Sequence, residues 1–191
     1  MDDRDERATG LDGDRLGARF LTLRDRLVGT AFFVVGDRQD ALEAVQEAFL
    51  RCWRARNTAT ALRDPDAWLF SVVLNTARDF RRRARVRTRV DGLPVEEAMQ
   101  PVSLAPEPPT LAERHEAVTL ARAAIEHLPE PEREVFLLRQ NGELTFEAIA
   151  ATLRVPVGTA KTRMRSALRR LREALERRLG SPQPSLGRTH P

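Results

Sequence analysis

LTFEAIAATLRVPVGTAKTRMRSALRRLREAL, residues 144–175, has the pattern of two helices joined by a short turn. Thr145 is placed to cap the first helix, whose apolar residues recur at helical spacing. Pro156 cannot continue that helix, because its ring removes the amide donor and disfavours a helical residue before it. A second helix is predicted from Val157 onward, with an inward face made of Ala160, Met164, Ala167, Leu168, Leu171 and Leu175.

The outer side of this second helix is strongly basic. Two helices joined by about three or four residues, of which the second presents Arg and Lys at its exposed start, suit insertion into a DNA major groove. The pattern places the following residues largely on the outer side of the helix: Lys161, Thr162, Arg163, Arg165, Arg169, Arg170 and Arg172. Taken alone, the segment also fits a solvated helix of a small bundle.

The composition predicts an all-α fold. The chain has 191 residues, of which 41% are apolar, enough for one compact domain or two small ones. Abundant Ala, Leu and Arg, together with the absence of Tyr, favour helices over sheets. No apolar run approaches membrane-spanning length, and the acidic first residues do not resemble a signal peptide. We therefore expect a cytoplasmic protein without membrane insertion.

Positive charge is concentrated in two windows. The net charge is only +4, but residues 78–89 hold seven Arg and one Asp, and residues 161–178 hold eight basic residues and two Glu. Each window therefore carries +6, while most of the remaining chain is acidic. Two separate basic patches of this kind indicate a polyanionic partner such as nucleic acid.

A proline-rich segment divides the chain. Five of the twelve prolines fall between residues 94 and 109, in a stretch without aromatic residues or sustained periodicity. The predicted organisation is a helical domain over residues 15–89, a flexible linker over 90–110 and a second helical domain over 111–179, in which the helix-turn-helix lies. Residues 1–14 and 180–191 are expected to be disordered arms.

The first domain is predicted to contain three helices. One covers about residues 16–35 and ends at Gly36, and the next begins at Asp37, a suitable N-cap. This second helix is expected to bury Ala41, Val45, Ala48, Phe49, Cys52 and Trp53. Its opposite, acidic side carries Asp40, Glu43, Gln46 and Glu47.

The third helix is predicted to start at Asp64 and Pro65, an N-cap followed by the favoured first helical residue. Its last turns project Asn75, Arg78, Arg81, Arg82 and Arg85. An amide can satisfy a donor and an acceptor on a base edge while arginines hold phosphates. A solvated polar face is the alternative for this set.

The residues that usually support catalysis are sparse. His115, His127 and His190 lack the spacing of a metal or nucleophile site, and the only cysteine, Cys52, provides no disulfide framework. Glu132 and Glu134 lie in a first helical turn, where the helix dipole favours carboxylates. We expect no catalytic residue, metal or cofactor, and no enzyme activity.

Three segments together resemble the two conserved regions of bacterial extracytoplasmic-function sigma factors. They are GDRQDALEAVQEAFLRCW, DPDAWLFSVVLNTARDFRRR and LPEPEREVFLLRQNGELTFEAIAATLRVPVGTAKTRMRSALRRLREAL, and they cover most of residues 16–178. The resemblance implies an alternative sigma factor that binds core RNA polymerase, directs it to promoter DNA and helps to melt the duplex. It also implies an anti-sigma factor as partner and association with the nucleoid in holoenzyme.

The resemblance also implies residue roles. Core polymerase would be contacted by Asp40, Glu43, Gln46 and Glu47. The minus-ten element would be bound by Asn75, Arg78, Arg81, Arg82 and Arg85. The minus-thirty-five element would be bound by Lys161, Thr162, Arg165 and Ser166, with their neighbours Thr145, Arg163 and Arg169. The loop 57–63 would frame a flipped base. The linker would hold the two modules on a tether.

One further expectation follows from comparison with the family pattern. Glycine commonly occupies the position of Arg154, so a positive φ is expected there.

A dimeric helix-turn-helix regulator that acts without polymerase is the main alternative function, and a structural helical adaptor or a nucleic-acid enzyme are more distant ones.

Overall fold

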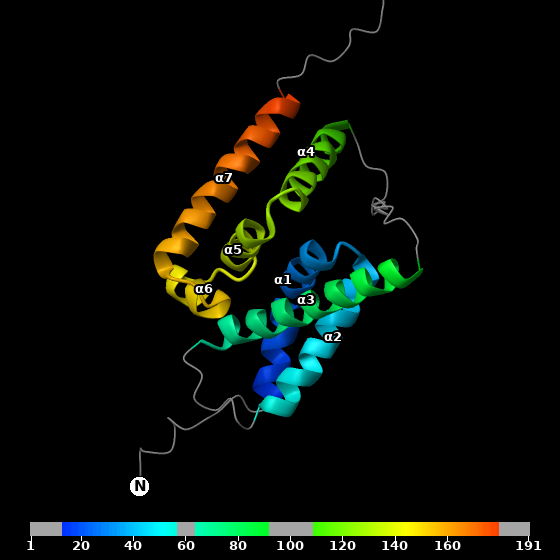
Figure 1. Ribbon diagram of the computed structural model, residues 1–191, viewed down its shortest axis with the longest axis vertical. Coiled ribbons are helices and arrows are strands. Elements are labelled where there is room, and N and C mark those ends of the chain that lie inside the picture. The colour runs from blue at the N-terminus through cyan, green and yellow to red at the C-terminus, as the bar shows by residue number, and fades with distance from the viewer. Residues whose placement is uncertain (1–12, 57–63, 92–108, 180–191) are drawn as a thin grey trace, which may run out of the picture.

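The computed structural model describes residues 13–56, 64–91 and 109–179, and within these ranges the chain forms seven α-helices and no strand (Figure 1). They are α1 (Gly13–Val35), α2 (Arg38–Ala55), α3 (Pro65–Asp91), α4 (Pro109–Glu126), α5 (Glu130–Gln140), α6 (Phe146–Leu153) and α7 (Val157–Leu179). The all-α prediction is confirmed. Three predicted features lie wholly or mostly outside the described residues: the two arms apart from residues 13–14, most of the linker, and the loop 57–63.

Helix ends differ from the predicted domain bounds by a few residues. Helix α1 includes residues 13–14, α3 continues to Asp91, and α4 already begins at Pro109. The early start of α4 has a simple cause, because the fixed φ of proline suits the first position of a helix. Helical structure therefore extends two residues into each end of the segment 90–110.

Local signals start and end the helices as predicted. Asp37 caps α2 by accepting a hydrogen bond from the Asp40 amide at 2.8 Å, and Asp64 accepts from the Ala67 amide at 2.9 Å. Gly36 follows α1 with φ +88°, a conformation that glycine adopts without steric cost.

The turn of the helix-turn-helix has the predicted geometry. The Thr145 hydroxyl accepts a hydrogen bond from the Ala148 amide at 3.1 Å and so caps α6. Arg154 ends α6 in the left-handed region, with φ 55° and ψ 48°, and its amide bonds back to the carbonyls of the last turn. The expected positive φ is confirmed. A residue with a Cβ pays roughly 1–2 kcal/mol for this conformation.

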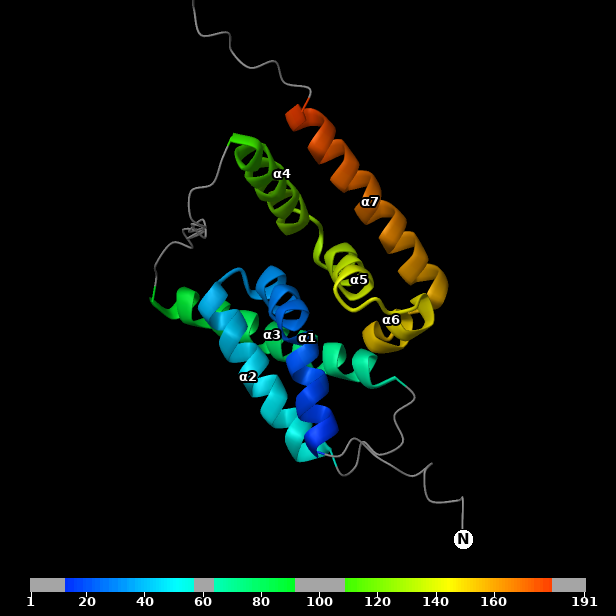
Figure 2. The same ribbon diagram turned by 180° about the vertical axis from the view of Figure 1, so that it is seen from behind.

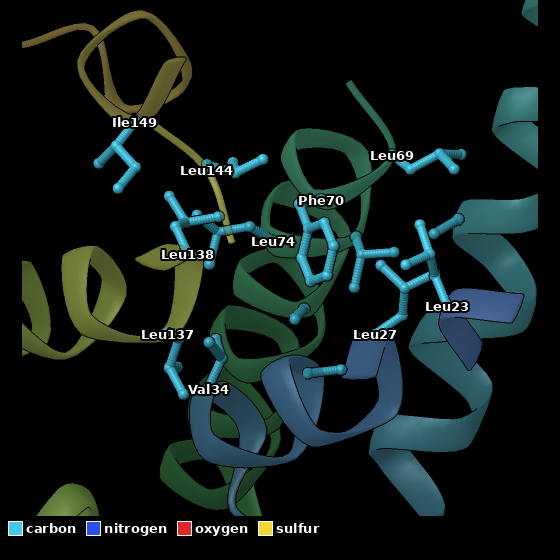
Figure 3. Packing of buried hydrophobic residues seen from close by; sticks show 14 of the residues in the cluster. Leu23, Leu27, Val34, Leu69, Phe70, Leu74, Leu137, Leu138, Leu144 and Ile149 are labelled. Atoms are coloured by element: carbon cyan, nitrogen blue, oxygen red, sulfur yellow. The ribbon is translucent and has the colours of Figure 1, made fainter. Parts of the chain in front are cut away.

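Helices α1, α2 and α3 pack against one another and form the core of the first half (Figure 2). Leu23 and Leu27 of α1 are buried against Leu69 and Phe70 of α3, as the close-up in Figure 3 shows. Trp53 was predicted to join this core, which is wrong. Its side chain is 38% exposed at the end of α2, where the Arg56 guanidinium lies 4.5 Å from the ring centroid.

In the second half, α4, α5 and α6 all pack against the long helix α7 (Figure 1). Ala160, Met164 and Ala167 are buried along α7 as predicted, but Leu168 is 49% exposed. The prediction for Leu168 is wrong. Successive residues of a helix are rotated by about 100° around its axis, and Leu168 lies beyond the face of α7 that the neighbouring helices cover.

The two halves are in contact. Helix α3 packs against α6 and α1 against α5, and one cluster of buried apolar side chains includes residues of both halves. Figure 3 shows Leu74 of α3 facing Leu138 of α5 and Leu144 of the following turn. The two halves are therefore joined by direct packing, an arrangement that the sequence did not predict.

Candidate nucleic-acid interface

The residues predicted to bind the minus-ten element share one surface of α3, which we call the minus-ten set: Asn75, Arg78, Arg81, Arg82 and Arg85. Their spacing of three and four residues places them on neighbouring turns of the helix. Asn75 is exposed, and its Oδ1 accepts a hydrogen bond from Arg78 Nη1 at 3.1 Å. Arg82 is 77% exposed and pairs with Asp79 at 3.1 Å, and Arg85 is exposed.

Two arginines of this set are paired with the other half of the protein. Arg78 binds Glu134 of α5 in a bidentate manner, with both nitrogen–oxygen distances at 2.6 Å, and Arg81 forms an ion pair with Glu130. The hydrogen bond to Glu134 raises the pKa of Arg78. The sequence interpretation of Glu134 as a first-turn carboxylate missed this contact, because Arg78 and Glu134 are 56 residues apart.

Opposing influences act on the pKa of the Glu130 carboxyl. Burial acts to raise the pKa of its carboxyl, but the hydrogen bond from Arg81 and the charges of Arg81, Arg78 and Arg133 outweigh burial, so the pKa is lowered. Arg133 shows the opposite balance, since burial and the charge of Arg81 lower its pKa despite the neighbouring carboxylates. The contact between the halves thus includes a compact group of three arginines and two glutamates.

The residues predicted to bind the minus-thirty-five element differ in exposure. Lys161, Thr162, Arg165 and Arg169 are exposed on α7, and Thr145 is exposed at the start of α6. Arg163 and Ser166 are half-buried. Part of the exposed set makes local contacts: the Thr162 hydroxyl donates to the Gly158 carbonyl at 2.9 Å, and Arg169 pairs with Glu173 at 3.0 Å.

The acidic residues predicted to contact polymerase form a strip on α2, which we call the docking strip: Asp40, Glu43, Gln46 and Glu47. Glu43 and Gln46 are exposed, whereas Asp40 and Glu47 are half-buried. Glu47 pairs with Arg51 at 3.1 Å, and Gln39 donates to Glu43 at 3.2 Å. Most of the strip therefore remains accessible.

An apolar groove beside this strip was missed by the sequence interpretation. This docking groove between α1 and α2 has a volume of about 520 Å³, and Phe20, Val45 and Phe49 lie among its lining residues. Leu21 at 72% and Leu50 at 46% exposure stand at its surface. The available signal was Leu21 itself, an apolar residue that falls outside the periodic core face of α1.

Other chemistry is limited in the described part of the chain. Burial raises the pKa of the Cys52 thiol to about 12. His127 is exposed, and its Nδ1 lies 2.7 Å from the Ala123 carbonyl oxygen; the side chain of His115 and the whole of His190 lie outside the described part. Within residues 13–56, 64–91 and 109–179, no group of three His, Cys, Asp or Glu residues could hold a metal ion. No helix among the described residues is long and apolar enough to cross a membrane.

The fold and these surfaces define a two-part helical protein whose second part ends in a basic helix-turn-helix. Comparison with known families agrees with this class. The family described as Sigma-70 region 2 matches residues 20–87, and the family described as Sigma-70, region 4 matches residues 119–171.

Characterised relatives carry the same description. The chain is 31% identical over 148 residues to the ECF RNA polymerase sigma-E factor of Escherichia coli K12, covering 73% of this chain and 74% of that protein. It is 28% identical over 174 residues to the RNA polymerase sigma-H factor of Pseudomonas aeruginosa, covering 87% and 88% of the two chains.

Solved structures share the fold. The sigma factor RpoE of Bartonella quintana, in complex with the anti-sigma factor NepR, superposes with a TM-score of 0.66 at 23% identity over 84% of this chain and 96% of that chain. CnrH in complex with the cytosolic domain of CnrY gives a TM-score of 0.62 at 20% identity over 87% and 90%.

The chain belongs to the extracytoplasmic-function sigma factors of the sigma-70 family. It is an alternative sigma factor for promoter recognition in transcription initiation, and it is not an enzyme.

Proposed function

We propose that this sigma factor divides its work among three surfaces. The docking strip and docking groove bind core RNA polymerase, the minus-ten set binds the melted strand, and α7 binds the upstream duplex. The observation that carries this assignment is the exposed amide of Asn75 beside four arginines on one helix, within the segment matched by Sigma-70 region 2.

On α3, the amide of Asn75 would read an unstacked base while the arginines hold the adjoining phosphates. Base flipping costs a few kcal/mol of stacking and pairing energy, and hydrogen bonds to the base with charge-assisted phosphate contacts offset that cost. Arg82 and Arg85 are exposed and accessible to a phosphate. Arg78 and Arg81 need Glu134 and Glu130 to withdraw first.

On the helix-turn-helix, Lys161, Thr162 and Arg165 are exposed at the start of α7, where a helix in the major groove meets base edges. Arg163, Ser166 and Arg169 complete the proposed minus-thirty-five surface. Thr145 lies at the N-terminus of α6, whose free amides favour a nearby phosphate.

Core polymerase would bind on α2. The accessible carboxylate of Glu43 and the amide of Gln46 suit basic and polar groups, and the neighbouring docking groove suits apolar side chains. A partner helix that carries both basic and apolar residues fits this combination.

The proposal also includes a regulator and a location. RpoE was solved in complex with the anti-sigma factor NepR, and CnrH was solved in complex with the cytosolic domain of CnrY. By analogy, an anti-sigma factor covers the polymerase-binding surface of this chain. The protein acts in the cytoplasm and is associated with the nucleoid when in holoenzyme, with functional domains at residues 15–89 and 111–179.

The roles are tested by transcription in vitro with core polymerase on a pool of promoter fragments. Asn75→Ala should slow promoter opening more than it weakens closed-complex binding. Permanganate reactivity of the promoter DNA measures the opening. Arg83→Ala is the matched control, because Arg83 is exposed on the same helix but packs over Phe80, at 5.7 Å, outside the minus-ten set. Equal opening rates for the Asn75→Ala variant and the wild type would remove Asn75 from the minus-ten site.

A further inference from the structure

The minus-ten set is partly closed by the protein itself. Glu134 binds Arg78 through two hydrogen bonds of 2.6 Å, and Glu130 pairs with Arg81. The Glu134 side chain is only 6% exposed and that of Arg81 only 15%. We call these two ion pairs the latch.

Contacts within the latch leave little room for a nucleic-acid strand. The guanidinium of Arg78 uses Nε and Nη2 for Glu134 and Nη1 for the Asn75 amide oxygen. A phosphate needs the same donors, since guanidinium binds carboxylate and phosphate in the same forked geometry. In addition, the two carboxylates place negative charge where a phosphate would approach.

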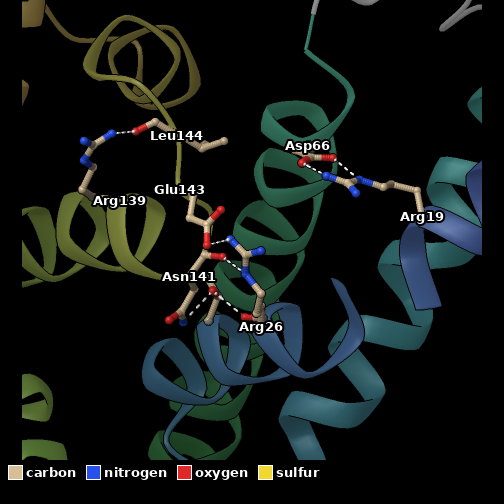
Figure 4. A network of polar contacts seen from close by, with 8 residues as sticks. Arg19, Arg26, Asp66, Arg139, Asn141, Glu143 and Leu144 are labelled. Atoms are coloured by element: carbon tan, nitrogen blue, oxygen red, sulfur yellow. Dashed lines mark hydrogen bonds and ion pairs between the residues drawn. The ribbon is translucent and has the colours of Figure 1, made fainter. Parts of the chain in front are cut away.

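The latch belongs to a wider contact between the halves. Arg26 of α1 donates to the Asn141 carbonyl and pairs with Glu143 at 3.2 Å, while Asn141 Nδ2 donates to the Thr30 hydroxyl at 3.1 Å (Figure 4). The apolar part is formed around Leu74, as described above. This contact combines apolar and ionic groups, and relative motion of two domains in one chain is the ordinary expectation unless their interface is large and mainly hydrophobic.

We propose that this sigma factor inhibits itself: Glu130 and Glu134 take the places of promoter phosphates on α3, and the minus-ten set becomes available only when α5 moves away. The proposal rests on the proposed role of the minus-ten set in binding DNA. The helix-turn-helix face is not blocked by the latch, because Lys161 and Arg165 remain exposed in the closed arrangement. Free protein is therefore inhibited in strand binding and not in duplex binding.

The first test removes the latch charges from the C-terminal half. Full-length Glu130→Gln/Glu134→Gln is compared with Glu126→Gln/Glu132→Gln, which changes the net charge equally; Glu126 pairs with Arg122 and Glu132 with Arg170, both within the C-terminal half. The probe is a fluorescein-labelled single strand that carries the minus-ten element of a promoter used by the holoenzyme, and the readout is anisotropy with free protein. Loss of the latch should tighten binding by about tenfold, in the usual range of coupling between two sites.

The outcomes separate the latch from the assigned site. Equal affinities of the two double variants would overturn the latch. Tighter binding that disappears on adding Asn75→Ala supports both the latch and the proposed minus-ten site. Tighter binding that Asn75→Ala leaves unchanged supports the masking but overturns the proposed role of Asn75.

A second test holds the halves together without altering any proposed DNA contact. A Cβ added at Gly29 would lie 3.6 Å from Asn141 Nδ2, so Gly29→Cys/Asn141→Cys places two thiols across the contact. The native Cys52 does not compete, because it is fully buried and its pKa is raised to about 12. Holoenzyme that contains the oxidised protein should lose strand binding and promoter opening, and dithiothreitol should restore both. Unchanged strand binding by the oxidised form, with the disulfide verified by gel mobility, would overturn the proposal.

Discussion

Arg51 of α2 lies with Nη1 3.4 Å from Asp79 Oδ2 of α3, while its Nε lies 3.1 Å from Glu47. Asp79 in turn pairs with Arg82 at 3.1 Å. A chain of four alternating charges therefore connects the docking strip on α2 with the minus-ten set on α3. The two proposed binding surfaces of the first half are joined by ionic contacts as well as by the shared core.

The first prediction concerns Asp79→Asn. The substitution should lower the free energy of unfolding by about 0.5–1 kcal/mol, because it weakens two partly exposed ion pairs at once. It should also leave Arg82 without a carboxylate partner and so strengthen single-strand binding by the holoenzyme. Urea unfolding and anisotropy measure the two effects. Asp25→Asn, at an exposed position of α1, is the control, and an equal change in both variants would contradict the role of the Arg51–Asp79 contact.

The second prediction concerns the turn of the helix-turn-helix. Arg154→Gly should raise the free energy of unfolding by about 0.5–1 kcal/mol, since glycine relieves the left-handed strain and gives back part of the gain through a more flexible unfolded chain. Arg154→Ala keeps the Cβ and should bring no such gain. Urea unfolding of both variants decides the matter, and destabilisation by the glycine substitution would contradict the strain argument.

Features fixed by local chemistry were predictable from the sequence. The caps at Asp37 and Thr145 and the left-handed Arg154 depend on a few neighbouring residues, so their patterns specify them. Trp53 and Leu168 were assigned to the core wrongly, because an apolar residue near the edge of a helix face is buried only when a neighbouring element covers it.

The closure of the minus-ten set was not predictable in the same way. The spacing along α3 placed Asn75, Arg78 and Arg81 on one surface, and the structure agrees. Their partners Glu130 and Glu134 lie beyond the proline-rich segment, so the pairing depends on how the two halves dock. No local periodicity carries that information.

The third prediction is a pH dependence that follows from the lowered pKa of Glu130. A carboxyl whose pKa is lower in the folded protein stabilises the fold fully at pH values above its pKa in the unfolded chain, about 4.3. This stabilisation is lost as the pH falls through the pKa of the folded protein. The difference in unfolding free energy between the wild type and Glu130→Gln should therefore be constant at neutral pH and shrink below about pH 4. Urea unfolding at pH 7 and pH 3.5 measures it. A difference that grows toward acid would contradict the assigned direction.

The fourth prediction separates polymerase binding from folding. Leu21 is 72% exposed at the docking groove, so Leu21→Ser removes little buried surface and should change the free energy of unfolding by less than about 0.5 kcal/mol. If the groove binds core polymerase and Leu21 is a hot spot of that contact, the same substitution should weaken holoenzyme assembly by about tenfold, because truncation of a hot-spot residue costs more than about 1 kcal/mol. Val118→Ser is the matched control, since Val118 is 65% exposed on α4, in the other half of the protein. Fluorescence anisotropy of labelled sigma factor with core polymerase provides the measurement, and equal affinities of the two variants would exclude the groove from the polymerase contact.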